Sequence, residues 1–134
     1  MKPHFLAVGL LAGMGAYVHL TKGGNFVLKP MLKNETVNEK SKLLLSSCWH
    51  LVTTMLLSSA VSATLIGSEV LSADSQVQAI AQDVLECSSK ALIGSAVTLL
   101  TVVGSHDLKN CVKFPQGPLM AVIGGWGLFA LRHK

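Results

Sequence analysis

The stretch that decides the fold is Leu43 to Gly67, LLLSSCWHLVTTMLLSSAVSATLIG, which holds no Asp, Glu, Lys or Arg. About 20 predominantly apolar residues in helical conformation cross the hydrocarbon core of a bilayer. This uncharged run is longer than that, so it predicts a membrane-spanning helix. It also contains a polar group that is costly to place in lipid, His50, directly after Trp49.

The composition of the whole chain agrees with a membrane location. Its 134 residues are enough for one domain, and we expect a single transmembrane domain over residues 1–134. Only 13% of the residues are charged, against about 25% in soluble domains, and the mean hydropathy is +0.51. Aromatic residues make up 5% of the chain, too few for nucleic-acid stacking platforms. The expected partner is therefore the lipid bilayer, not nucleic acid.

Three further apolar runs complete a predicted set of four spans, at about 5–20, 43–67, 84–104 and 118–131. The first run could pass for a secretory signal peptide, but its cleavage region is weak, and we interpret it as a spanning helix. Apolar residues at helical spacing extend the third helix back toward residue 77, with polar residues on its other faces. The expected fold class is an all-α, integral membrane, four-helix transmembrane bundle with up-down topology and a long, partly amphipathic third helix.

Residues 21–42 and 105–117 are expected to be loops, with the apolar middle of the first at the interface or packed beneath the bundle. Asn38 or Ser41 is the expected cap of the second helix, and Asp74 or Ser75 that of the third. The two loops hold seven lysines, whereas the remaining loop is acidic. The positive-inside rule then places these loops in the cytoplasm and the termini opposite, although the basic C-terminus favours the reverse. The expected compartment is a bacterial or organellar inner membrane.

Small residues recur four positions apart in three of the predicted spans. Such rows let helix backbones approach closely in lipid, where packing drives helix association. We therefore expect them to pack against other helices, either of this chain or of other membrane protein subunits. The rows are Gly9 and Gly13, then Ser59, Ala63 and Gly67, and then Gly117, Ala121 and Gly125.

Polar side chains gather at one end of the predicted bundle. Up-down topology brings the end of the first helix, the start of the second, the end of the third and the start of the fourth to the same level. The residues placed together there are His19, Trp49, His50, His106 and Gln116. An ionisable group inside a membrane is a functional candidate by default, so these residues form a candidate ligand-binding site.

Three interpretations of this cluster stay open. In the first, neutral histidines hydrogen-bond nearby carbonyls or serines, and Trp49 belongs to the aromatic belt. In the second, the cluster contacts a quinone or a lipid head group. In the third, His19 and His50 ligate a b-type haem or a metal ion. Counting from Lys22 and Lys42 places the two rings roughly 7 Å apart in depth, which counts against one haem held by both.

Catalysis is not expected from this sequence. It has no phosphate-binding loop and no HExxH or GxSxG motif. Cys48 lies near His50, but residues two apart on a helix do not face each other. Three cysteines without a CxxC pair indicate neither a disulfide framework nor a structural zinc site. No catalytic residue is therefore predicted, and the cysteines predict no metal site.

Short motifs lie along most of the chain: His19 with Gly23-Gly24, Lys29-Pro30-Met31-Leu32, Cys48-Trp49-His50-Leu51, and Phe114-Pro115-Gln116. Together they resemble small, uncharacterised bacterial four-helix inner-membrane proteins. The segment Gly15-Ala16-Tyr17-Val18-His19, with Gly125-Trp126 near the end, is similar to a second group of four-helix proteins of unknown function. The resemblances imply a four-helix fold and an inner membrane, and they supply no catalytic residue.

The leading hypothesis is a small non-enzymatic integral membrane protein that serves as an accessory or scaffold subunit of a membrane protein complex. The alternative is a histidine-based membrane redox protein that binds haem, a metal or a quinone. No cofactor is assigned, and haem b is the group that a pair of membrane histidines would suit. A transporter or channel is disfavoured, because no Asp, Glu, Arg or Lys lies deep in a span.

Overall fold

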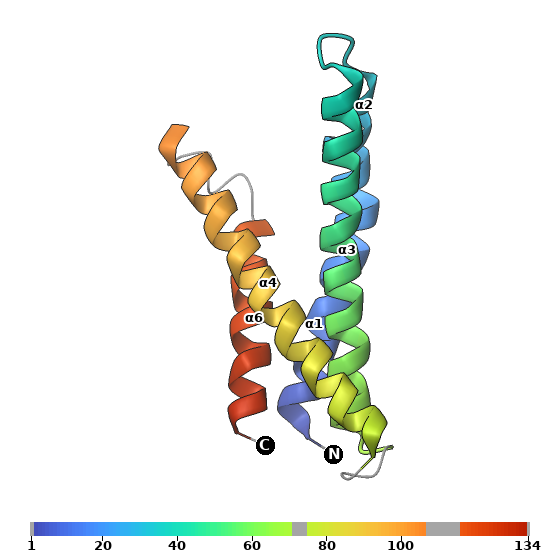
Figure 1. Ribbon diagram of the computed structural model, residues 1–134, viewed down its shortest axis with the longest axis vertical. Coiled ribbons are helices and arrows are strands. Elements are labelled where there is room, and N and C mark those ends of the chain that lie inside the picture. Colours follow the sequence, from blue (N-terminus) through green and yellow to red (C-terminus); the bar gives the residue numbers. More distant parts are fainter. Residues whose placement is uncertain (1, 71–74, 107–115, 134) are drawn as a thin grey trace.

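The computed structural model describes residues 2–70, 75–106 and 116–133, and this part of the chain is helical throughout apart from short connections. The helices of the described residues form four long rods, which can be followed in Figure 1. The first joins α1, η1 and α2, and the others are α3, α4 and α6. Their bounds are α1 Pro3–Val18, η1 His19–Leu28, α2 Lys29–Lys33, α3 Glu39–Ser68, α4 Gln76–His106 and α6 Gln116–Arg132. The predicted all-α fold with four helices is confirmed for the described residues.

Three of these rods are long and apolar enough to cross a membrane: Pro3–Lys33, Glu39–Ser68 and Gln76–Thr101. The fourth, α6, has 17 residues. The chain rises through the first rod, descends α3, rises through α4 and descends α6, so that both termini lie at the same end (Figure 1).

The prediction of a loop over residues 21–42 is wrong. The first helix continues through η1, a π-helical segment, to Lys33, and only a short turn separates it from α3. Pro30 has no N–H to donate, but it lies where the hydrogen-bond pattern changes from π to α, so it interrupts less than it would inside a regular helix. Packing against α3 also outweighs the low helix propensity of Gly23 and Gly24.

The start of α3 follows the sequence closely. Asn38 Oδ1 accepts a hydrogen bond from the Ser41 backbone N–H at 2.8 Å, which makes Asn38 the N-cap. At the start of α4, Ser75 Oγ accepts from the Gln78 N–H at 3.1 Å. Asn38 and Ser75 are thus the capping residues among the candidates, and Asp74 lies outside the described residues.

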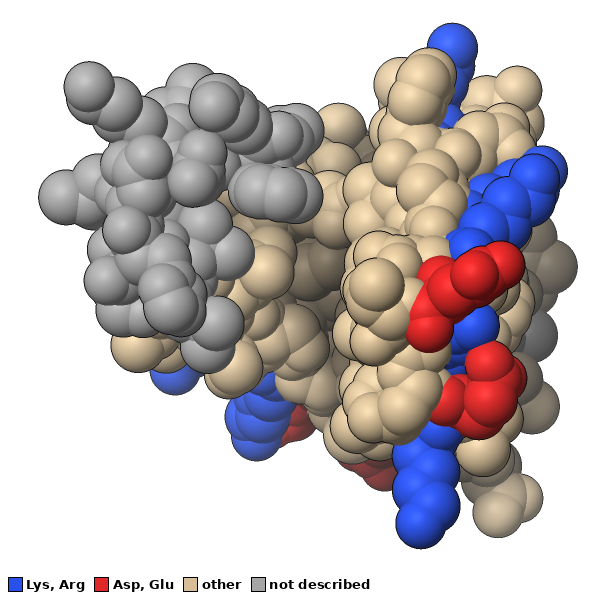
Figure 2. Space-filling view, turned by 90° about the horizontal axis from the view of Figure 1, so that it is seen from above, with Lys and Arg blue, Asp and Glu red and all other residues tan. Residues whose placement is uncertain are grey.

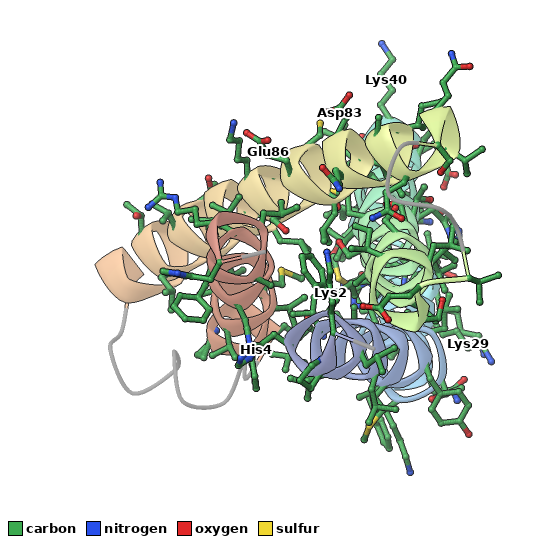
Figure 3. All side chains as sticks on the ribbon, turned by 90° about the horizontal axis from the view of Figure 1, so that it is seen from below. Lys2, His4, Lys29, Lys40, Asp83 and Glu86 are labelled. Carbon is green, nitrogen blue, oxygen red and sulfur yellow. The ribbon has the colours of Figure 1, made fainter. Side chains whose placement is uncertain are left out.

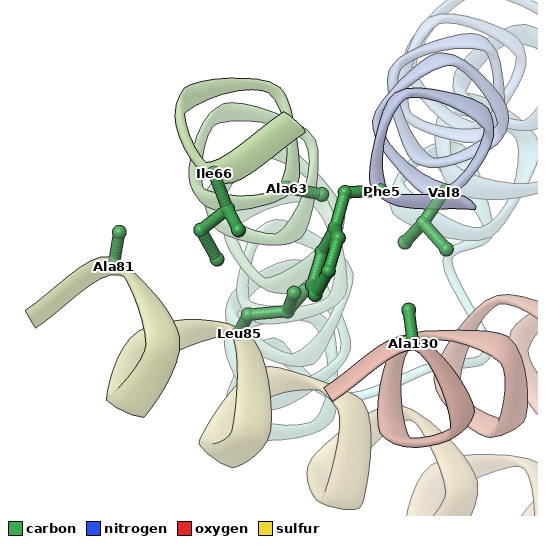
Figure 4. Close-up of a cluster of buried hydrophobic side chains, with 7 residues drawn as sticks. All are labelled: Phe5, Val8, Ala63, Ile66, Ala81, Leu85 and Ala130. Carbon is green, nitrogen blue, oxygen red and sulfur yellow. The ribbon is translucent and has the colours of Figure 1, made fainter. Parts of the chain in front are cut away.

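The helices form two pairs that are close at the end bearing the termini and diverge toward the other end (Figure 1). The first helix pair is α1–η1–α2 with α3, and the second is α4 with α6. Figure 4 shows the core where all four rods meet, with the ring of Phe5 extending from α1 toward Leu85 of α4. The residues of this core are Phe5, Val8, Ala63, Ile66, Ala81, Leu85 and Ala130.

The small residues lie mostly where helices approach one another. A Cβ at Gly9 would stand 3.2 Å from the carbonyl oxygen of Ala60, and one at Gly67 would stand 2.9 Å from Leu6. Ser59 and Ala63, also of the predicted row on α3, are fully buried.

On α6 the contact face is rotated from the predicted row. Gly125 is exposed, and a Cβ there would meet nothing within 4 Å. Gly117 instead packs against Leu99 and Leu100 of α4, and Gly124 and Gly127 both face Ser89. Ala121 is partly buried at the edge of a second apolar cluster. The contact face of α6 therefore includes Gly117, Gly124 and Gly127. The larger buried residues Met120 and Ile123 lie between Gly117 and Gly124.

Charged side chains lie at the outside of the structure. Asp83 and Glu86 are exposed on the side of α4 turned away from the other helices (Figure 3), which agrees with the predicted amphipathic start of this helix. At the opposite end, Figure 2 looks down on the tip of the first helix pair, where basic and acidic side chains cover the outer side. The exposed charges at this tip are Lys29, Lys33, Glu35, Glu39 and Lys40.

Candidate membrane ligand site

The most buried ionisable side chain of the described helices is His19, at the junction of α1 and η1, which is 6% exposed. Its imidazole lies face to face with the indole of Trp49 on α3, with ring centroids 3.9 Å apart and an interplanar angle of 14°. Nε2 of His19 also lies 3.3 Å from the carbonyl oxygen of Trp49. One turn of η1 is thereby fixed to one turn of α3 by both a ring contact and a hydrogen bond.

The hydrogen bond fixes which nitrogen of His19 carries the proton. A carbonyl oxygen only accepts, so Nε2 must be the N–H that donates to Trp49. In the neutral ring, Nδ1 is then an acceptor. No described residue donates a hydrogen bond to it. The carbonyl of Trp49 also accepts from Thr53 Oγ1 at 3.2 Å, so it does not depend on His19 alone.

Gly23 lets the indole of Trp49 lie directly on the helix backbone. A Cβ at this position would stand 2.8 Å from Cζ2 and Cη2 of Trp49, and 3.3 Å from Nε2 of Gln116. Hydrogen bonds in a π-helix run from residue i to i+5, so each turn holds more residues than an α-helical turn. His19, Gly23 and Val27 consequently share one side of η1, and all three line the space between the helix pairs.

That space contains two cavities, with volumes of about 240 Å³ and 270 Å³. Together we call them the His19 cleft. Four residues line both cavities: His19, Val27, Gln116 and Met120. The first cavity extends toward Phe26 and Leu119, and the second toward Trp49 and Leu99. The cleft is therefore bounded by η1, α3, α4 and α6, with few polar groups on an apolar wall.

Three of the five residues predicted for the polar cluster meet at the cleft: His19, Trp49 and Gln116. His50 is exposed on α3 and lines neither cavity. His106 ends α4, and its side chain lies outside the described part of the structure. The predicted group thus assembles around one histidine rather than two.

The expected difference in depth between the helices is also wrong. It assumed that the first helix ends near Lys22 and that the second starts near Lys42, whereas these helices end at Lys33 and start at Glu39. His19 is stacked on Trp49, which directly precedes His50, so His19 and His50 lie at about the same height along the helix pair. Depth therefore does not separate the two histidines. Their side-chain directions do, because successive residues on an α-helix point about 100° apart.

Sequence reasoning missed Val27 and Met120 as lining residues of the cleft, and it treated Gly23 only as part of a motif. The sequence predicts a loop at Val27, and a residue in a loop cannot be assigned to a helix face. Placing Met120 in the cleft requires knowing which face of α6 contacts the other helices, and a row of small residues alone does not define that face.

Among the described residues, no three His, Cys, Asp or Glu side chains lie close enough together to hold a metal ion.

The described residues are thus helical, with three helices long and apolar enough to cross a membrane and two mostly apolar cavities beside a buried histidine. No protein-family model, curated protein or solved structure matches this chain.

Proposed function

We propose that the chain is a small, non-enzymatic integral membrane protein that serves as an accessory or scaffold subunit of a membrane protein complex. In the most apolar windows of its three candidate spans, 39%, 39% and 28% of the residues are buried within the chain. The remaining apolar surface needs an apolar environment, which lipid and the helices of other subunits both provide.

The observation that carries the subunit proposal is a groove on the outer side of α1, lined by Leu6, Gly9, Leu10, Gly13, Met14, Tyr17, Val18 and Thr64. Its volume is about 750 Å³. At its floor, a Cβ on Gly13 would meet only the Cβ of Ala60, at 3.9 Å. On its rim, Leu10 is 66% exposed and Tyr17 is 69% exposed. A helix from another subunit can approach closely over Gly13 while the large rim residues pack along its sides.

The compartment that we propose is a bacterial inner membrane, or the inner membrane of an organelle. The exposed lysines at the tip of the first helix pair, from Lys29 to Lys40, support a cytoplasmic position for this tip and the opposite side for the termini. The connection between the first rod and α3 is shorter than the loop expected over residues 21–42, because the first rod continues to Lys33 and α3 begins at Glu39.

The test is purification of the tagged chain from its native membranes in mild detergent, after confirming that alkaline carbonate does not extract it. We expect an assembly larger than the chain, with a second polypeptide in fixed stoichiometry. Gly13→Leu fills the groove and should release that polypeptide. Gly94→Leu is the matched control, because Gly94 is exposed on α4 and a Cβ there meets nothing within 4 Å. A lone monomer, or an assembly that Gly13→Leu leaves intact, would contradict the proposal.

A second candidate function is the binding of a membrane-soluble ligand in the His19 cleft. It is supported by a buried histidine that lies beside two cavities and whose acceptor nitrogen Nδ1 receives no hydrogen bond from any described residue. The haem form of this idea is less well supported, because His50 lines neither cavity. An absorption spectrum of the purified protein tests it directly. A Soret band that disappears in His19→Ala would restore haem as the ligand.

A further inference from the structure

We infer that the His19 cleft binds the hydroxyl-bearing aromatic ring of a neutral, membrane-soluble ligand, and that a quinol is the class of molecule that fits it. This inference rests on the second candidate function and is independent of the proposed subunit role. It concerns binding alone and requires no redox step.

The hydrogen-bonding groups of the cleft favour a ligand that donates. Nε2 of His19 is engaged by Trp49, so the ring offers an incoming molecule only the acceptor Nδ1. A hydroxyl group supplies the missing donor. Within the described part of the chain, the side-chain amide of Gln116 makes no hydrogen bond either, and it both donates and accepts. A ring with hydroxyl groups therefore satisfies both residues, whereas the oxidised ring, which only accepts, satisfies Gln116 alone.

The lining of the cleft favours a neutral ligand over a phosphate head group. The one charged side chain among its described lining residues is Lys22, which is exposed. Phosphate groups are held by several charge-assisted hydrogen bonds, commonly from arginine. The rest of the wall is mostly apolar, from residues such as Val27, Leu99 and Met120. Binding sites for small molecules have volumes of about 300–1,000 Å³ with mostly apolar walls. The two cavities, which share four lining residues, have volumes of about 240 Å³ and 270 Å³, just below that range, and their walls are mostly apolar.

The direct experiment compares two forms of one probe on the unmodified protein. The full chain is placed in phosphatidylcholine nanodiscs and immobilised, and retention of ubiquinol-1 or ubiquinone-1 is measured without oxygen against empty discs. We expect saturable retention of about one ubiquinol-1 per chain. Ubiquinone-1 should bind about tenfold more weakly, since one hydrogen bond in an apolar site is worth about 1.4 kcal/mol, a factor of ten. No saturable retention, or equal retention of both forms, would overturn the inference.

Variants then place the binding at the cleft. His19→Phe keeps a planar ring against Trp49 but removes both nitrogens, so it should weaken ubiquinol-1 binding about tenfold and abolish the preference for the reduced form. Val27→Trp fills space common to both cavities and should prevent retention of either form. His50→Phe is the matched control and should change nothing, because His50 lies outside the cleft. Helical content measured by circular dichroism verifies that each variant is folded.

Two further outcomes have a fixed meaning. If phosphatidylglycerol in the nanodisc displaces ubiquinol-1, the occupant is an anionic lipid head group and the inference is wrong. If His19→Phe retains the preference for ubiquinol-1, the donor–acceptor argument fails. Neither outcome affects the subunit role, which is measured by the assembly and its response to Gly13→Leu. The two ideas can therefore fail separately.

Discussion

Ser59 Oγ on α3 donates a hydrogen bond to Ser88 Oγ on α4 at 2.8 Å, and Ser88 Oγ donates in turn to the carbonyl oxygen of Leu85 at 3.2 Å. Both serines are buried, at 0% and 6% exposure. This pair joins the first helix pair to the second by a polar contact inside the protein.

A double-mutant cycle on these serines should give a measurable coupling. Ser59→Ala, Ser88→Ala and the double variant, compared by unfolding in detergent, should give a coupling energy of about 0.6 kcal/mol and at most about 1.7 kcal/mol, the range of interhelical hydrogen bonds in membrane proteins. The coupling stays modest because Ser88 keeps its bond to Leu85 when Ser59 is removed. Strictly additive effects would mean that the two hydroxyl groups do not interact.

Gly9 and Gly13 should respond differently to the same small change. Gly9→Ala places a Cβ 2.5 Å from Thr64 Oγ1 and 3.2 Å from the Ala60 carbonyl oxygen, so α1 must move away from α3. We expect a loss of about 1–3 kcal/mol in the free energy of unfolding. Gly13→Ala makes only an ordinary contact with Ala60 and should be neutral or stabilising, as alanine has the higher helix propensity. Thermal unfolding followed by circular dichroism compares them, and equal effects would contradict the observed contact face.

Neighbouring glycines on α6 provide a second matched comparison. A Cβ on Gly124 would stand 2.6 Å from the backbone carbonyl oxygen of Ser89, an atom that cannot turn aside. Gly124→Ala should therefore lower the free energy of unfolding by about 1–3 kcal/mol. Gly125→Ala faces open space and should raise it by up to about 1 kcal/mol. Chemical unfolding of both variants is the measurement. A destabilising Gly125→Ala beside a neutral Gly124→Ala would show that α6 is rotated from the position described.

Gly23 should control the position of Trp49. Gly23→Ala drives a methyl group into the indole, at 2.8 Å from two of its carbons, so the indole must leave its place against η1. With Trp126→Phe as background, Trp49 is the sole tryptophan, and its fluorescence emission should change on this substitution. Gly24→Ala meets nothing within 4 Å and should leave the emission unchanged. The same emission spectrum in both variants would contradict the packing of Trp49 on Gly23.

The sequence predicts the long helices well because their signals are local. An uncharged run ending near Gly67 and capping residues such as Asn38 and Ser75 define where α3 and α4 lie. The continuation of the first helix through η1 is not predictable in this way. Gly23, Gly24 and Pro30 oppose a helix locally, and the stabilising contacts, such as that with Trp49, come from a segment distant in sequence.

From the sequence one can predict which helix ends meet at the candidate site, but not which side chains enter it. Up-down topology places His19, Trp49 and Gln116 at one level, and the structure brings these three together at the cleft. Excluding His50 requires the rotation of α3 about its own axis. That rotation is set by packing over the whole helix, including Leu56 and Ile66. The adjacent pair Trp49-His50 carries no information about it.

The unequal lengths of the helices have a consequence for any bilayer around the chain. With a rise of about 1.5 Å per residue, the 30 residues of α3 extend about 45 Å, whereas the 17 residues of α6 extend about 26 Å. The hydrocarbon core is about 30 Å thick. In the four-span arrangement that the sequence predicts, lipid beside α6 would thin to match it, while α3 would tilt or emerge into water. The protein then experiences hydrophobic mismatch of opposite sign on its two flanks, and its energy in the membrane depends on local bilayer thickness.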